Sequence, residues 1–127
     1  MKFYELELDG EIIKLRLTTG DCKQIEKSTG MSILDYIQNI SITTICDILM
    51  YMRRSDVPNF TPKQAESLLD KFIDNDYTLE DIMYNVIYEG LVVSGFLKKA
   101  DLIEMKEKAT EVKKQITEKK TKELVQE

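Results

Sequence analysis

Two short alternating runs on either side of Asp9-Gly10 constrain the fold of this chain more than any other feature. Apolar and charged residues alternate in "YELEL", residues 4–8, and again in "IKLRL", residues 13–17. A period of two is typical of a strand with one buried face, and Asp-Gly between two such runs is the strongest short-range signal for a two-residue hairpin turn. The predicted register pairs Leu8 with Glu11, Leu6 with Ile13, Tyr4 with Leu15, and Glu5 with Lys14.

A two-stranded hairpin is marginally stable alone in water, so its apolar face needs a cover. Helix-start signals follow it along the chain, each ahead of apolar residues at steps of three and four. The predicted starts are Thr18 or Thr19, Ser32 with Asp35, Ser41 or Thr44, Thr61 with Pro62 and Gln64, and Thr78 with Asp81. We therefore predict an α+β, mainly α fold, in which an N-terminal β-hairpin precedes a bundle of about five helices, the last of them long and charged.

The helical spacing also predicts the core. The residues expected to face inward are Cys22, Ile25, Ile33, Leu34, Ile37, Ile40, Ile45, Ile48, Leu49, Met52, Ala65, Leu68, Leu69, Phe72, Ile73, Leu79, Ile82, Met83, Val86, Ile87 and Leu91. The helix that opens at Thr78 is the most hydrophobic, so we expect it to be central. Gly90 and Gly95 are expected to weaken its end.

The composition changes near residue 98, because nine of the 18 basic residues lie in the last 30 positions, alongside seven acidic ones. This change predicts a globular hairpin-plus-helices domain over residues 1–97. Residues 98–127 are predicted to form a charged C-terminal helix that is partly disordered at its end.

An apolar seam runs along this C-terminal helix at intervals of three and four, as in a coiled coil of about two heptads. Its members are Leu102, Met105, Ala109, Val112 and Ile116. A seam this short does not hold an isolated helix firmly in water, so it packs back on the domain, pairs with a second copy, or binds a partner. These five residues are the candidate partner-binding positions.

Several chemistries are disfavoured by composition. The chain has no histidine, which removes the Ser/His and Cys/His nucleophile pairs and the commonest zinc ligands. Cys22 and Cys46 lie among apolar helical neighbours and are expected to be buried thiols. The carboxylates of Asp74, Asp76 and Asp81 suit turns and helix caps better than a metal site. We therefore expect no catalytic residues, no metal and no cofactor.

Charge and hydropathy point to a protein partner. The net charge is −5, and residues 1–97 alone carry nine basic against 16 acidic residues, which opposes binding to nucleic acid or to an anionic membrane. No apolar run approaches the ~20 residues of a membrane-spanning helix. We expect a cytoplasmic protein with neither nucleic acid nor membrane as a partner. The alternative is a small helical DNA-binding regulator of phage or bacterial origin, in which a capped helix would enter a groove.

The run "GEIIKLRLTTGDCKQIEKSTGMSILDYI", residues 10–37, resembles the opening of tail assembly chaperones from long-tailed bacteriophages, and is similar to the small tail component of gene transfer agents. The shared pattern is a strand of the form G-x-x-apolar-[KR]-L-x-L-[ST] from Gly10, a helix with the pair Ile25-Glu26, and Gly30 followed by a small residue and an apolar run. It covers about a quarter of the chain.

The resemblance implies a non-enzymatic protein of the host bacterial cytoplasm that acts during virion morphogenesis. Such a protein holds the tape measure protein in solution and helps to recruit tail tube subunits around it. The family has no catalytic motif to transfer to this sequence. We also expect a homo-oligomer, because an unpaired outer edge of the hairpin would be a template for self-association.

Overall fold

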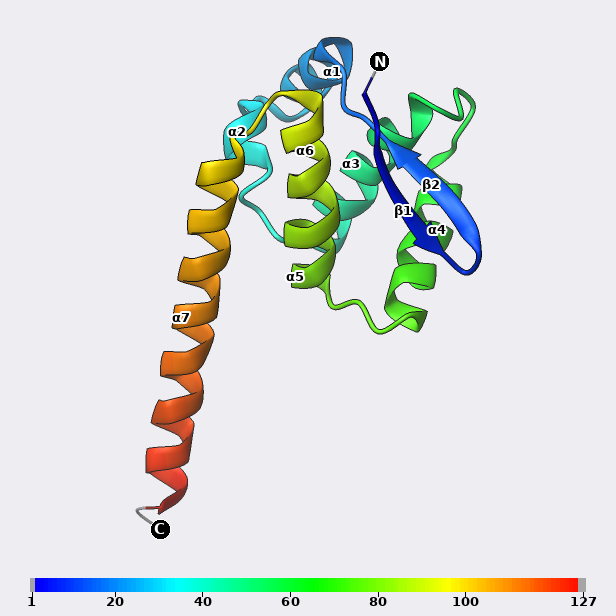
Figure 1. Cartoon of the computed structure of the whole chain (residues 1–127). Helices are drawn as coiled ribbons and strands as arrows, with labels where there is room; N and C mark the ends of the chain where they lie inside the picture. The colour runs from blue at the N-terminus through cyan, green and yellow to red at the C-terminus, as the bar shows by residue number, and fades with distance from the viewer. Residues whose placement is uncertain (1, 126–127) are drawn as a thin grey trace. The chain divides into compact units, whose positions relative to one another are not determined.

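A computed structural model describes residues 2–125, with side chains for residues 2–112. It divides into two compact units, residues 1–97 and residues 98–127. The first unit holds a two-stranded antiparallel sheet and a set of helices, and the second is one long helix (Figure 1). The predicted α+β, mainly α class is confirmed. Residues 126–127, at the end of the tail where disorder is predicted, lie outside the described residues.

The hairpin has the predicted register. Strands β1 (Tyr4–Leu8) and β2 (Glu11–Leu15) pair as Leu8–Glu11, Leu6–Ile13, Glu5–Lys14 and Tyr4–Leu15. The turn residues Asp9 and Gly10 both have positive φ, 51° and 77°, as a two-residue turn that matches the twist of the strands requires. The Asn75 side chain donates a hydrogen bond to Asp9 Oδ1 at 3.0 Å, which ties the turn to the end of a helix.

Side-chain caps start the helices where the sequence places them. Thr18, Thr61 and Thr78 each form a capping box and open α1 (Thr19–Thr29), α4 (Pro62–Asp74) and α5 (Leu79–Ile82). Ser32 and Ser41 cap α2 (Ile33–Tyr36) and α3 (Ile42–Arg54). Each cap satisfies a backbone N–H that the first helical turn leaves without a partner. Gly30 ends α1 at φ 72°, as predicted.

The segment after Thr78 is continuous but not uniform. A π-helical turn, η1 (Met83–Ile87), separates α5 from α6 (Tyr88–Ser94). Such single turns insert one residue into an α-helix and rotate the face that follows. The rotation brings Tyr88 into the core, where its hydroxyl donates to the carbonyl oxygen of Ile37 at 2.6 Å. No residue pattern in the sequence predicts this turn.

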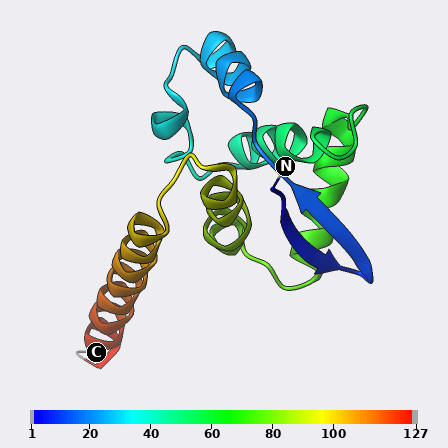
Figure 2. The same ribbon diagram turned by 45° about the horizontal axis from the view of Figure 1, so that its top comes forward.

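The core of the first unit lies beneath β2 and around α3. Helix α3 contacts β2, α4, α5 and η1, so it is the central helix, and the prediction that the helix opened by Thr78 would be central is wrong. Figures 1 and 2 show the hairpin lying across α3 and α4. Fully buried side chains come from the strand and from all of these helices, and include Leu15, Ile45, Ile48, Leu49, Met52, Phe72, Ile82, Met83 and Ile87.

Four predictions about apolar positions need correction. Leu34 lies on the exposed face of α2 and is 53% exposed, and because the helix ends at Tyr36, Ile40 lies beyond it and is 39% exposed. Ile73, at the end of α4, is 47% exposed because the core stops at Phe72. Gly90 does not weaken a helix end: it lies inside α6, where a Cβ atom would overlap the methyl group of Met52, so its lack of a side chain permits close packing on α3.

The helix of the second unit is α7 (Lys99–Val125), which spans 27 residues. At a rise of 1.5 Å per residue it is about 40 Å long. An ion pair of 3.1 Å joins Lys108 to Glu104, one turn away, and both side chains are well exposed. Exposed pairs of this kind contribute a few tenths of a kcal/mol, about 0.3–0.5, to a helix. The predicted single long, charged helix is present.

Candidate functional site

The five predicted partner-binding residues fall in α7, at different exposures. Leu102 is buried, Met105 and Ala109 are half-buried, and Val112 is 53% exposed. The side chain of Ile116 lies outside the described residues, although its backbone is helical. Ile103, which sequence analysis did not select, is 47% exposed on a different face of the same helix. The helical backbone sets the five positions in one row, as the spacing requires.

A second apolar surface lies around α2 and the turn that follows it. Met31, Leu34, Ile40 and Ile42 are exposed by 36%, 53%, 39% and 60% within twelve consecutive residues. Exposed apolar side chains scattered singly are ordinary, whereas several in one segment are typical of contact surfaces. The sequence pattern placed Leu34 and Ile40 in the core, and so it missed this surface.

The residues that carry the family resemblance have structural roles here. Ile25 is buried in the core, and Glu26 accepts a hydrogen bond at Oε1 from the backbone N–H of Ile33 at 3.1 Å. The Ile25-Glu26 pair therefore fixes α1 to the core and to the start of α2. The capping box of Thr18 and Asp21 sets the turn between β2 and α1.

A pocket of about 220 Å³ opens between the hairpin and the helices of the first unit. Its lining is Glu11, Ile13, Arg53, Phe60, Gln64, Ser67, Leu68 and Lys71, from β2, the end of α3, the following loop and α4. Sequence reasoning missed this pocket because its residues lie up to 60 positions apart. The wall combines apolar side chains with both signs of charge.

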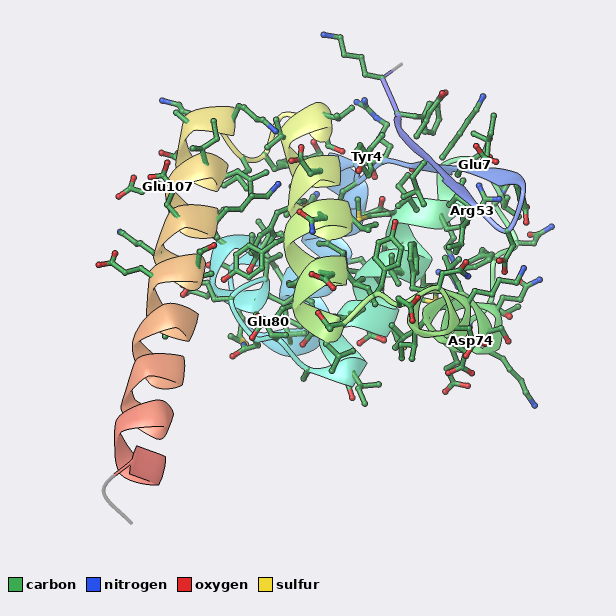
Figure 3. All side chains as sticks on the ribbon, turned by 60° about the horizontal axis from the view of Figure 1, so that its bottom comes forward. Tyr4, Glu7, Arg53, Asp74, Glu80 and Glu107 are labelled. Atoms are coloured by element: carbon green, nitrogen blue, oxygen red, sulfur yellow. The ribbon has the colours of Figure 1, made fainter. Side chains whose placement is uncertain are left out.

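Arg53, labelled in Figure 3, is one of the residues that line that pocket. Its side chain is only 10% exposed, and its guanidinium lies 2.8 Å from Asp56 and 3.7 Å from Glu11. It also donates to the carbonyl oxygen of Lys14 at 3.4 Å. These contacts join α3 to β2. Asp56, three residues on, was the one local signal that could have suggested a buried ion pair.

Both cysteine thiols of the first unit have raised pKa values. Burial raises the pKa of Cys22 to about 11, with Asp21 and Glu26 adding to the effect, and burial also raises the pKa of Cys46. Cys22 is buried as predicted, whereas Cys46 is only partly buried. A thiol with a raised pKa is a weak nucleophile at neutral pH, because the thiolate is the reactive form.

Two tyrosines are likewise neutral and structural. Burial raises the pKa of Tyr88 to about 12, and burial together with the neighbouring Asp47 carboxylate raises that of Tyr36 to about 12. The Tyr36 hydroxyl donates to Asp47 Oδ2 at 3.3 Å. Neither phenol is placed to exchange protons near neutral pH.

Two further observations concern the described residues only. Within residues 2–125, no helix combines the length and the apolar character needed to cross a membrane. No group of three or more Cys, Asp or Glu side chains in the described part of the chain could hold a metal ion.

Comparisons with known proteins identify no relative. No protein-family model matches this chain, and neither a curated protein nor a solved structure does so.

Proposed function

We propose that this chain is a non-enzymatic tail assembly chaperone of a phage or prophage, acting in the host bacterial cytoplasm. In this role it binds a helical part of the tape measure protein and helps to recruit tail tube subunits. The observation that carries the proposal is α7, a helix of 27 residues with Val112 53% exposed in a row of apolar positions. A partner helix can cover such a row by coiled-coil or helix-in-groove packing.

The resemblance over residues 10–37 is the reason for proposing a tape measure protein as the binding partner. The segment forms β2, α1 and α2, and its characteristic residues act as a strand, a capped helix and a glycine exit. The exposed apolar side chains of residues 31–42 lie at its end and supply a further surface for a protein partner. Self-association into a homo-oligomer belongs to the proposal as well, since a chaperone that lines a long helical partner must act in several copies.

The test is co-purification with a tape measure fragment. Substituting Met105→Glu and Val112→Glu together places two charges in the apolar row, and we expect at least about a tenfold loss of binding, equivalent to 1.4 kcal/mol. The substitutions should leave the cooperative unfolding of residues 1–97 unchanged.

A matched control adds the same two charges elsewhere on the helix. Ile103 and Thr110 lie on another face of α7, so Ile103→Glu with Thr110→Glu should bind the fragment like the wild type. Equal loss of binding in both double variants would show that charge alone is responsible. Retained binding by the Met105→Glu, Val112→Glu protein would reject the proposed contact.

A further inference from the structure

The end of α3 covers part of the outer edge of β2 and of the residue after it. The Arg16 N–H donates to the Met52 carbonyl oxygen at 3.1 Å, and the Ser55 hydroxyl donates to the Arg16 carbonyl oxygen at 2.8 Å. Arg53 donates to the carbonyl oxygen of Lys14 on the same edge. These three bonds occupy the Lys14 carbonyl and both backbone groups of Arg16, so the outer edge of β2 is partly covered.

The outer edge of β1 is open. Because the turn at Asp9-Gly10 has two residues, Leu8 and Glu11 form the hydrogen-bonded pair nearest to it. Hydrogen-bonded and non-hydrogen-bonded pairs alternate along an antiparallel ladder. The backbone N–H and C=O groups of Glu5 and Glu7 therefore point away from β2. Among the described residues, none is hydrogen-bonded to these backbone groups. An edge of this kind is a template for another strand.

The buried face of the hairpin is incomplete on the same side. Ile13 and Leu15 of β2 are buried, whereas Tyr4 and Leu6 of β1 are only half-buried. Tyr4 extends from β1 toward η1, where its hydroxyl donates to the Asn85 carbonyl oxygen at 2.8 Å (Figure 3). A third strand would place its own apolar side chains beside Tyr4 and Leu6 and reduce their exposure to water.

The charged residues on the exposed face of β1 favour a particular kind of added strand. The outward face of β1 carries Glu5 and Glu7, both exposed. Glu5 has Lys14 across the pair at 3.8 Å, whereas Glu7 faces Ile12, which is 61% exposed. Opposite charges on directly facing residues stabilise a strand pair, and like charges destabilise it. Basic residues at two alternating positions of an added strand would face these two glutamates.

The same rule disfavours a second copy of this chain at this edge. In a symmetric antiparallel pairing of β1 with its own copy centred on Glu5, Leu6 or Glu7, at least one of these glutamates faces a glutamate of the other strand. Each such pairing brings like charges together on the exposed face. Symmetric self-association through the middle of β1 is therefore disfavoured.

We propose that the free edge of β1 binds an extended segment of a partner protein in which apolar residues alternate with lysine or arginine. The backbone of Glu5 and Glu7 forms the hydrogen bonds, their carboxylates face the basic side chains, and the apolar side chains lie beside Tyr4 and Leu6. Strand addition of this type obtains affinity from main-chain hydrogen bonds and specificity from alternate side chains. The inference is independent of the proposed function and of α7.

The test uses a synthetic peptide with the alternation of this protein's own residues 13–17, Ile-Lys-Leu-Arg-Leu, and an acidic twin in which both basic residues are glutamate. The full chain should bind the basic peptide at least about tenfold more tightly than the twin, a difference of 1.4 kcal/mol. Substituting both glutamates, Glu5→Lys with Glu7→Lys, should reverse the preference. Equal affinity for the two peptides, or no binding of the basic one, would overturn the proposal.

A proline substitution at Glu7 separates the contribution of the backbone hydrogen bond to peptide binding from that of the carboxylate charge. Glu7→Pro removes an N–H that points away from β2, so the β1–β2 ladder remains complete. This variant should lose peptide binding, whereas Glu7→Gln, which keeps the N–H, should retain part of it. Circular dichroism checks the fold, and the double lysine variant tests the site should the proline variant unfold. Self-association of the wild type that Glu7→Pro abolishes would instead identify a second copy as the occupant, and would contradict the proposal.

Discussion

Strands β1 and β2 have the same alternation of apolar and charged residues, yet they have very different surroundings. Ile13 and Leu15 of β2 are buried against the core, and the Lys14 carbonyl and the backbone of Arg16, just after the strand, are bonded to the end of α3 and to Ser55. Tyr4 and Leu6 of β1 are half-buried, and its outer edge is free. The difference shows that an alternating pattern determines which residues face inward but leaves open how completely neighbouring elements cover them. In this hairpin Ile13 and Leu15 of β2 are more completely covered than Tyr4 and Leu6 of β1.

The largest expected effect compares two leucines on the same face of the hairpin. Leu15→Ala creates a cavity at a site with no exposure and should lower the free energy of unfolding by about 2–5 kcal/mol. Leu6→Ala removes a half-exposed side chain and should cost only about 1–2 kcal/mol. Urea unfolding of both variants measures the two losses. Equal losses would mean that β1 is as well covered as β2.

An intermediate effect concerns the ion pairs on either side of β2. Arg53→Met removes charged hydrogen bonds at a side chain that is only 10% exposed, and should cost about 1.5–3 kcal/mol. Lys14→Met removes the 3.8 Å pair with Glu5, in which both side chains are about half exposed, and should cost less than about 1 kcal/mol. Chemical denaturation at low and high salt distinguishes them, because salt screens the exposed pair. A larger loss from Lys14→Met would contradict the structural role of Arg53.

The smallest expected effect is a loss of stability at alkaline pH, which comes from the buried tyrosine hydroxyls and is absent at neutral pH. Tyr88 has a pKa of about 12 in the folded protein against 10.0 for an exposed tyrosine. Because the folded-state pKa is the higher one, the unfolded chain loses its proton first, and stability that is complete below pH 10 should fall as the pH rises toward 12. Urea midpoints across this range, with phenolate absorbance, measure the effect.

Replacing that phenol supplies the comparison. Tyr88→Phe loses the hydrogen bond to Ile37 and should be less stable at neutral pH, with a shallower decline above pH 10. A decline as steep as that of the wild type would assign the alkaline effect to other tyrosines, with Tyr36 the next to substitute.

The local features of this fold could be predicted because short-range chemistry determines them. The turn at Asp9-Gly10, the register of the hairpin, the five capped helix starts and the exit at Gly30 each depend on residues within a few positions of one another. The candidate seam of α7 likewise follows from spacing alone, and its role as a contact remains a prediction.

The tertiary structure decided everything that depends on residues distant in sequence. It selected α3 as the central helix, exposed Leu34, Ile40 and Ile73, and used Gly90 to accommodate Met52. It also joined Arg53 to Glu11, left the backbone groups of Glu5 and Glu7 without partners among the described residues, and bonded the Lys14 carbonyl and Arg16 to the end of α3 and the residue after it. A repeating pattern of apolar residues defines a face, but burial and free edges depend on which other elements reach that face, and only the packed chain determines that.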